Sequence, residues 1–218
     1  KPEIRNAHPH CDSSGEIAVV QNGIIENFQS LRKELTAEGF QFASDTDTEV
    51  IPHLIAREIK QLLDQTNVSK GSLLLRAVQK TLSQLEGAYA LSVVWALAPD
   101  TLVVARRQAP LLIGLGEGEF LCASDTPALA GFTRTILPME DGEVALLTPL
   151  GIELYNANGL RQQRNPSLIS GVEHVADKSN FRHFMLKEIH EQPETAALWV
   201  TRYLPEGLPA HSPVAMPF

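Results

Sequence analysis

The stretch from Glu16 to Ile51, EIAVVQNGIIENFQSLRKELTAEGFQFASDTDTEVI, decides the fold and holds the polar residues that suggest a site. It begins with an apolar run that predicts a strand, and the pair Asn22-Gly23 follows directly. Apolar residues at i, i+3 and i+7 then predict a helix, with Asn27 as its N-cap. Phe40 to Phe42 alternate as in a short strand, and Asp47 lies in the polar turn that follows.

Two further helices and a long β-rich region follow. Residues 50 to 62 and about 72 to 85 carry apolar stripes at helical spacing. From Tyr89 to Tyr155 the chain changes to short β-rich runs separated by turn signals, without long helices between them. This pattern indicates antiparallel sheets and not βαβ units. We therefore expect an α+β fold of two stacked, mainly antiparallel sheets with helices outside.

The C-terminal part is more polar. Residues 161 to 179 are expected to be irregular, and residues 181 to 192, FRHFMLKEIHEQ, predict a short helix or ordered turn. Another helical stretch is expected after Pro193. Residues 205 to 218 contain four prolines and are expected to be loose or extended.

Composition excludes several classes of function. The chain has 218 residues and a formal net charge of -8, so it has no basic footprint for nucleic acid. No run of about 18 apolar residues predicts a membrane span, and the first residues lack the apolar core of a signal peptide. We expect a cytoplasmic protein.

The two cysteines do not form a disulfide framework. Cys122 lies in an apolar run and is typical of a small buried hydrophobe, whereas Cys11 lies in a polar run near His8 and His10. Cys11 could be a nucleophile, or the three residues could bind a metal. Since no second Cys or His cluster follows at ligand spacing, we expect no metal, and nothing in the sequence calls for a cofactor.

Three polar positions could serve the hydrolysis of a side-chain amide. An Asn carboxamide beside a backbone N–H suits a tetrahedral oxyanion, so Asn22 and Gly23 are candidates, although Asn-Gly is also a common hairpin turn. Asp47 could bind the ammonium group of an amino acid, or simply stabilise a helix N-terminus. His8 could orient neighbours or transfer protons, or only fix the loop beside Pro9.

Several segments resemble, in order, the motifs of the glutaminase domain of the class II glutamine amidotransferases, whose nucleophile is an N-terminal Cys. The resemblance covers most of residues 5 to 193, through the segments NAHPH, VVQNGIIEN, FASDTDTEVIPHLI, LEGAYALSVV, ARRQAPLLIGLG, FLCASDTPAL and FRHFMLKEIHEQP. It implies the four-layer α/β/β/α sandwich of the N-terminal-nucleophile hydrolases. It also implies that Asn22 and the N–H of Gly23 form the oxyanion hole, and that Asp47 binds the amino group of glutamine.

The segment at 181 to 193 is most similar to the branch of the family that aminates a sugar phosphate. This implies L-glutamine as nitrogen donor, fructose 6-phosphate bound by isomerase domains outside the chain, and a homo-oligomeric parent enzyme. Residues 1–193 would be the glutaminase domain, incomplete at its N-terminus, and residues 194–218 a linker. The alternatives are a phosphoribosyl-pyrophosphate amidotransferase or asparagine synthetase type, or a binding module without catalysis.

The chain departs from the family pattern at its start. The family's Cys-Gly-Ile beginning and its His-Thr-Arg-Trp segment, whose Arg binds the glutamine carboxylate, are not in the sequence. We therefore expect that the chain by itself does not hydrolyse glutamine. We also expect that a sheet edge or a core face is left uncovered.

Overall fold

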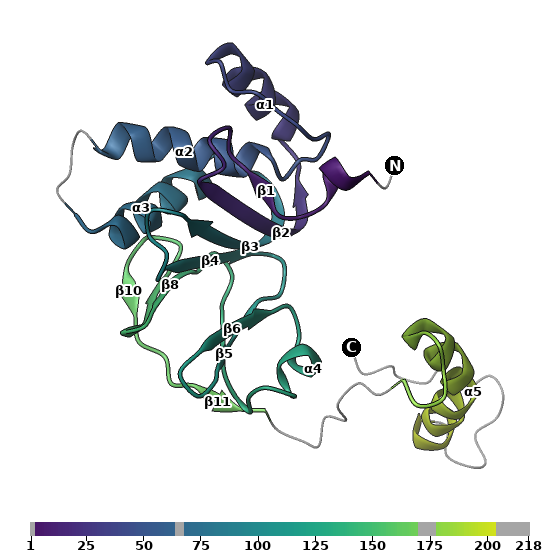
Figure 1. Cartoon of the computed structure of the whole chain (residues 1–218). Coiled ribbons are helices and arrows are strands. Elements are labelled where there is room, and N and C mark those ends of the chain that lie inside the picture. The colour runs from purple at the N-terminus through teal and green to yellow at the C-terminus, as the bar shows by residue number, and fades with distance from the viewer. Residues whose placement is uncertain (1–2, 64–67, 170–177, 204–218) are drawn as a thin grey trace. The chain divides into compact units, whose positions relative to one another are not determined.

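A computed structural model of the chain describes residues 3–63, 68–169 and 178–203 (Figure 1). The chain divides into two compact units, residues 1–173 and residues 174–218. The first unit contains both sheets and the candidate site. None of the helices in the described residues combines the length and the hydropathy that a membrane span requires.

Seven strands form the larger sheet of the first unit, and every neighbouring pair is antiparallel. The sheet is built around β2 and β3, which pair over nine residues. In sheet order the strands are β1 (His10–Cys11), β2 (Ile17–Ile25), β3 (Gly87–Trp95), β4 (Leu102–Arg107), β8 (Val144–Thr148), β9 (Gly151–Tyr155) and β10 (Arg161–Gln162).

A smaller antiparallel sheet stacks on one face of the larger one (Figure 1). Its strands, in order, are β11 (Ser167–Leu168), β7 (Thr135–Pro138), β5 (Leu112–Leu115) and β6 (Phe120–Ala123). Buried side chains from the two sheets meet in one apolar cluster that includes Val104, Leu147, Ile113 and Leu137. The predicted α+β fold with two stacked antiparallel sheets is confirmed.

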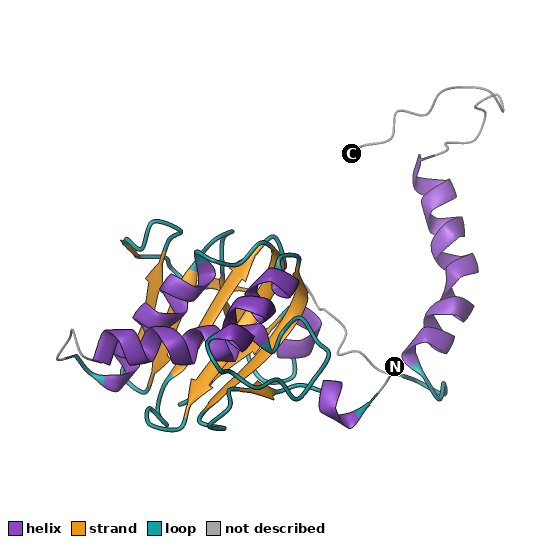
Figure 2. Cartoon of the chain, turned by 90° about the horizontal axis from the view of Figure 1, so that it is seen from above, coloured by secondary structure: helices purple, strands orange, loops and turns teal. Residues whose placement is uncertain are grey.

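Three helices cover the other face of the larger sheet (Figure 2). They are α1 (Phe28–Ala37), α2 (Val50–Leu63) and α3 (Lys70–Leu82), close to the predicted bounds. The main core lies between them and the sheet, with Leu35, Leu54 and Leu74 fully buried. A short 3-10 helix, η1 (Ile4–Asn6), precedes β1, and the one-turn helix α4 (Thr126–Leu129) lies beside β6.

Two local predictions near α1 need correction. Asn27 occupies the N-cap position, but its side chain does not cap the helix. Its carboxamide instead donates to the carbonyl of Gln84 at 2.8 Å and accepts from the N–H of Glu86 at 3.1 Å, which ties α1 to the start of β3. The short strand predicted at Phe40 to Phe42 is absent, because the backbone of these residues pairs with no neighbouring strand in the described part of the chain. Both rings pack around the buried His53.

The region after β9 also differs from the prediction. Residues 161 to 179 were expected to be irregular, but they contribute the short edge strands β10 and β11 to the two sheets. Two-residue strands carry too little apolar alternation to be visible in a sequence. Residues 205 to 218 lie outside the described residues.

The described residues of the second unit, 178–203, contain one helix, α5 (Phe184–Tyr203), which continues through Pro193. The sequence predicted a break there, since proline removes one helical N–H and crowds the preceding turn. Good helix formers, such as Leu186, Lys187 and Ala196, lie before and after Pro193. Their helix propensity favours a continuous helix despite the one hydrogen bond that the proline removes.

Candidate active site

The pair Asn22-Gly23 lies inside β2 and not in a turn. Asn22 is paired with Ala90, and Gly23 with Tyr89, in the continuous ladder between β2 and β3. The hairpin turn that an Asn-Gly pair commonly forms is therefore excluded. Gly23 has a φ of 135°, and a Cβ at this position would lie 2.0 Å from the carbonyl oxygen of Ala88. Only glycine fits so close to a neighbouring strand.

Asn22 points away from the main core. Ile17, Val19 and Ile25 of β2 are buried beneath the helices, so the alternation of side chains directs Asn22 to the opposite face of the sheet. On that face Asn22 is exposed between Val20 and Ile24, which are 48% and 65% exposed. The carboxamide is accessible to a ligand on a partly apolar surface.

Asp47 lies in the loop before α2, and its side chain reaches the C-terminal end of β2. Its Oδ2 accepts a hydrogen bond of 2.7 Å from the backbone N–H of Ile25, two residues after Gly23. Asp47 is thus bound to the sheet and does not act only as an acid at the N-terminus of α2. Its other carboxylate oxygen accepts no hydrogen bond from the described residues, so it remains available to an ammonium group.

Three sets of hydrogen bonds fix the loop that carries Asp47. At its end the Glu49 carboxylate accepts hydrogen bonds from the N–H of Ala43 at 2.7 Å and from the N–H of Ser44 at 2.8 Å. The hydroxyl of Thr48 donates to Oε1 of Gln21 on β2. The hydroxyl of Thr46 lies 3.1 Å from Nε2 of His10 on β1. Asp47 therefore lies between two residues that are each bound to the sheet.

His10, and not His8, makes the contact with this loop. His8 is exposed, and its ring packs edge-on against that of His10 at a centroid distance of 5.0 Å. His10 is buried, and burial, together with the neighbouring His8, lowers the pKa of its imidazole below 6.5. His10 is thus held neutral near pH 7. The role suggested for His8 remains a prediction.

The two thiols lie in different settings. Cys11 is on β1, paired with Ala18, and is exposed. Cys122 packs against the cluster between the sheets, and burial raises the pKa of its thiol to about 11. A buried thiol with a raised pKa holds little thiolate at neutral pH, which disfavours Cys122 as a nucleophile.

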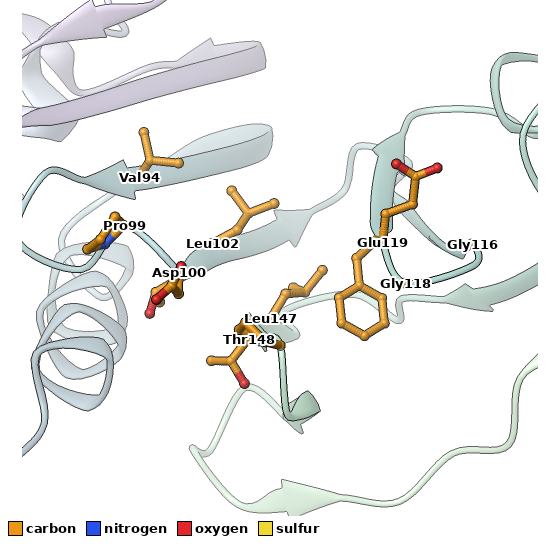
Figure 3. A pocket seen from close by; sticks show the side chains of 12 residues that line it. Val94, Pro99, Asp100, Leu102, Gly116, Gly118, Glu119, Leu147 and Thr148 are labelled. Atoms are coloured by element: carbon orange, nitrogen blue, oxygen red, sulfur yellow. The ribbon is translucent and has the colours of Figure 1, made fainter.

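A cleft of about 460 Å³ lies at the open end between the two sheets, away from these residues. Figure 3 shows Val94, Leu102 and Leu147 of the larger sheet facing the turn that carries Gly116, Gly118 and Glu119. Its lining includes neither Asn22 nor Asp47, so this cleft is separate from the candidate site.

Residues 3–131 match the family model described as a glutamine amidotransferase domain. The chain belongs to this family. The match includes Asn22, Gly23 and Asp47, together with β1 to β4 of the larger sheet and β5 and β6 of the smaller one.

The chain is similar to several bacterial proteins named glutamine–fructose-6-phosphate aminotransferase (isomerizing). It is 53% identical to that of Nostoc sp. (strain PCC 9229) over 207 residues, which is 95% of this chain and 32% of that protein. It is 50% identical to that of Synechocystis sp. over 219 residues, which is 98% of this chain and 34% of that protein. The chain thus spans about a third of the length of the curated relatives it matches.

A solved structure of glutamine phosphoribosylpyrophosphate amidotransferase from B. subtilis has a similar fold. The TM-score is 0.56 at 25% sequence identity, over 72% of this chain and 33% of that one. The likeness confirms the amidotransferase fold of the N-terminal-nucleophile type, and the sequence identity to the proteins named glutamine–fructose-6-phosphate aminotransferase is about twice as high.

Sequence reasoning missed the residues that hold the site together. Glu49, Thr46 and Gln21 have no distinctive spacing, and only the folded structure shows that they fix the loop. One available signal was the density of acidic and hydroxyl residues between Ser44 and Glu49, since such side chains readily bond nearby backbone groups.

Proposed function

We propose that this chain is the glutamine-hydrolysing domain of a glucosamine-6-phosphate synthase. The observation that carries the proposal is the 2.7 Å hydrogen bond between Asp47 and the N–H of Ile25. It supports a site in which a carboxylate for the ammonium group of glutamine lies beside a candidate oxyanion pair, Asn22 and Gly23.

The residues have separate roles in this proposal. Asp47 binds the α-ammonium group and places the side-chain amide over β2. The nucleophile, an N-terminal Cys in the family, attacks the amide carbon, and the carbonyl oxygen becomes an oxyanion. The carboxamide of Asn22 and the N–H of Gly23 stabilise that charge as hydrogen-bond donors. The proton lost by the thiol passes to the amide nitrogen, so ammonia leaves as the C–N bond breaks. Water then hydrolyses the thioester, which releases glutamate and restores the thiol.

The acceptor of the ammonia belongs to the rest of the protein. By similarity to the named relatives, we propose fructose 6-phosphate as acceptor and glucosamine 6-phosphate as product. A homo-oligomeric parent and a cytoplasmic location remain part of the same proposal.

The test uses the full-length protein that contains this chain. Glutamate release from glutamine, and formation of glucosamine 6-phosphate when fructose 6-phosphate is added, are the expected results. Glutamate release with amination of phosphoribosyl pyrophosphate or aspartate instead would retain the glutaminase and reject the sugar acceptor. No glutamate release from a folded protein would reject the proposal in favour of a binding module.

A further inference from the structure

We propose that Glu49 is a positioning residue for glutamine binding: its buried carboxylate fixes the loop that presents Asp47. The proposal rests on the function proposed above, in which Asp47 binds the ammonium group. Glu49 itself touches neither the substrate nor the reacting atoms.

The contacts of Glu49 are unusually complete for a carboxylate. The residue is only 3% exposed, directly before α2. Its two oxygens accept from the N–H of Ala43 at 2.7 Å, the N–H of Ser44 at 2.8 Å and the hydroxyl of Ser44 at 2.7 Å. Burial by itself would raise the pKa of Glu49, but these hydrogen bonds outweigh it, and the net pKa lies below the ordinary value of 4.5. Glu49 is therefore a carboxylate at neutral pH.

These hydrogen bonds join Ser44 to Glu49, the two ends of the loop that carries Asp47, and so close the loop at its base. Ser44 and Glu49 are five positions apart, so fixing both ends leaves four residues to span the gap. Arg32 on α1 adds a hydrogen bond of 2.8 Å to the carbonyl of Ser44, which holds the same end from the other side. With the base closed, the Asp47 carboxylate reaches the N–H of Ile25. Opening the base would allow Asp47 to move off β2.

A purely structural role for Glu49 is the alternative, and α2 offers a matched control. Glu58 lies on α2, the helix that Glu49 directly precedes, and is also buried, at 6% exposure. It accepts from Nε2 of Gln84 at 3.0 Å and pairs with Lys80 at 3.7 Å, so it contacts the end of α3 and not the Asp47 loop. Both residues are buried glutamates with polar partners, but only Glu49 is bound to the candidate site.

The first measurement compares Glu49→Gln and Glu58→Gln in the full-length protein. One acceptor oxygen becomes an amide donor that faces an N–H group, so the loop loses a charge-assisted hydrogen bond. We expect Glu49→Gln to raise the KM for glutamine about tenfold, with kcat within about twofold of the parent value. Glu58→Gln should leave both constants unchanged. Glutaramate, the analogue of glutamine without the α-amino group, should show no change in KM with Glu49→Gln, because it does not use Asp47.

The second measurement needs no enzymatic activity. The N–H of Ile25 donates to Asp47, so its hydrogen exchange, followed by NMR on this chain, reports on the loop directly. Glu49→Gln should accelerate exchange at Ile25 but not at Val93, which lies inside β3 and pairs with Val103, and Glu58→Gln should accelerate neither. Unchanged exchange at Ile25, or equal changes of KM for glutamine and glutaramate, would overturn the positioning role. Absence of glutamate release from the parent protein would reject the glutaminase proposal and with it the link to glutamine, and the exchange measurement would still decide whether Glu49 fixes the Asp47 loop.

Discussion

The backbone N–H of Ile25 and the carboxylate of Asp47 are joined by a 2.7 Å hydrogen bond, although 22 positions separate them in the sequence. This bond places the acid beside the end of the strand that carries Asn22 and Gly23. One oxygen of this carboxylate thus binds the loop to β2, and the other is available to a ligand. A substitution that removes both oxygens of Asp47 is therefore expected to act on both.

Asn22→Ala should lower kcat for glutamine hydrolysis by roughly 10²–10³ in the full-length protein, because it removes one donor to the oxyanion. The exposed position of Asn22 means that folding should not suffer. Steady-state kinetics and a thermal unfolding curve check both points. Asn158→Ala, in the exposed turn after β9, is the control and should change neither. An unchanged kcat in folded Asn22→Ala would remove Asn22 from the mechanism.

Asp47→Asn should act mainly through glutamine binding, since it discharges the partner of the ammonium group. We expect a KM for glutamine at least about tenfold higher, which corresponds to loss of a hydrogen bond to a charged group. Glutaramate should be nearly unaffected. An equal loss with both substrates would show that Asp47 serves the fold and does not bind the amino group.

Gly23→Ala should destabilise the protein by more than about 2 kcal/mol, because the new methyl group meets the Ala88 carbonyl at 2.0 Å and the φ of 135° disfavours a side chain. Urea unfolding measures the change. Gly15→Ala is the matched control, since Gly15 also has a positive φ, of 73°, but has no atom within 4 Å of a new Cβ. If the free energy of unfolding falls equally in the two variants, the close approach of β3 to Gly23 is not what makes Gly23→Ala destabilising.

Gln108→Gly should stabilise the protein by about 0.5–1 kcal/mol. Gln108 is exposed and has a φ of 59°, a left-handed conformation that costs a residue with a side chain about 1–2 kcal/mol. Glycine removes this strain, but it loses more backbone entropy on folding, which offsets part of the gain. Its N–H donates to Asp141, and glycine keeps that bond. A lower unfolding midpoint in urea would show that the Gln108 side chain contributes more than its strain costs.

The helices and most strands could be predicted from sequence, because their signals are local. The stripe at Ile51, Leu54 and Ile55 places α2, and the alternation within Tyr89 to Trp95 places β3. The course of β2 could not be predicted, because it depends on a partner that is distant in the sequence. β2 continues through Asn22-Gly23 only because β3 pairs with it over nine residues, and that ladder outweighs the local turn preference.

In the candidate site, too, local residues could be recognised from the sequence, whereas contacts between distant residues could not. The resemblance to the family named Asn22, Gly23 and Asp47, but it did not show that Glu49 and Thr48 hold Asp47 in place. These bonds join residues whose types are common in any loop. They become visible only when α2, β1 and β2 are brought together.

The free energy of unfolding should fall as the pH is lowered below about 6.5, because of His53. This side chain is 1% exposed, between the rings of Phe40 and Phe42, and neither ring nitrogen has a hydrogen bond among the described residues. Burial, more than any other influence, lowers the pKa of His53 below 6.5, while Glu49 at 3.8 Å opposes the shift. The folded protein therefore holds His53 neutral where the unfolded chain takes up a proton.

The unfolded state then binds more protons than the folded state, so stability is lost as the pH falls through 6.5, and the loss ends below the lowered pKa of the folded state. The slope cannot exceed about 1.4 kcal/mol per pH unit for one histidine. Urea unfolding at pH 7.5, 6.5 and 5.5 measures it. His53→Leu, which keeps an apolar side chain between the two rings, should reduce the slope, and His183→Gln at an exposed position should not. An undiminished slope in His53→Leu would assign the acid sensitivity to other groups, with the buried His10 as the next to test.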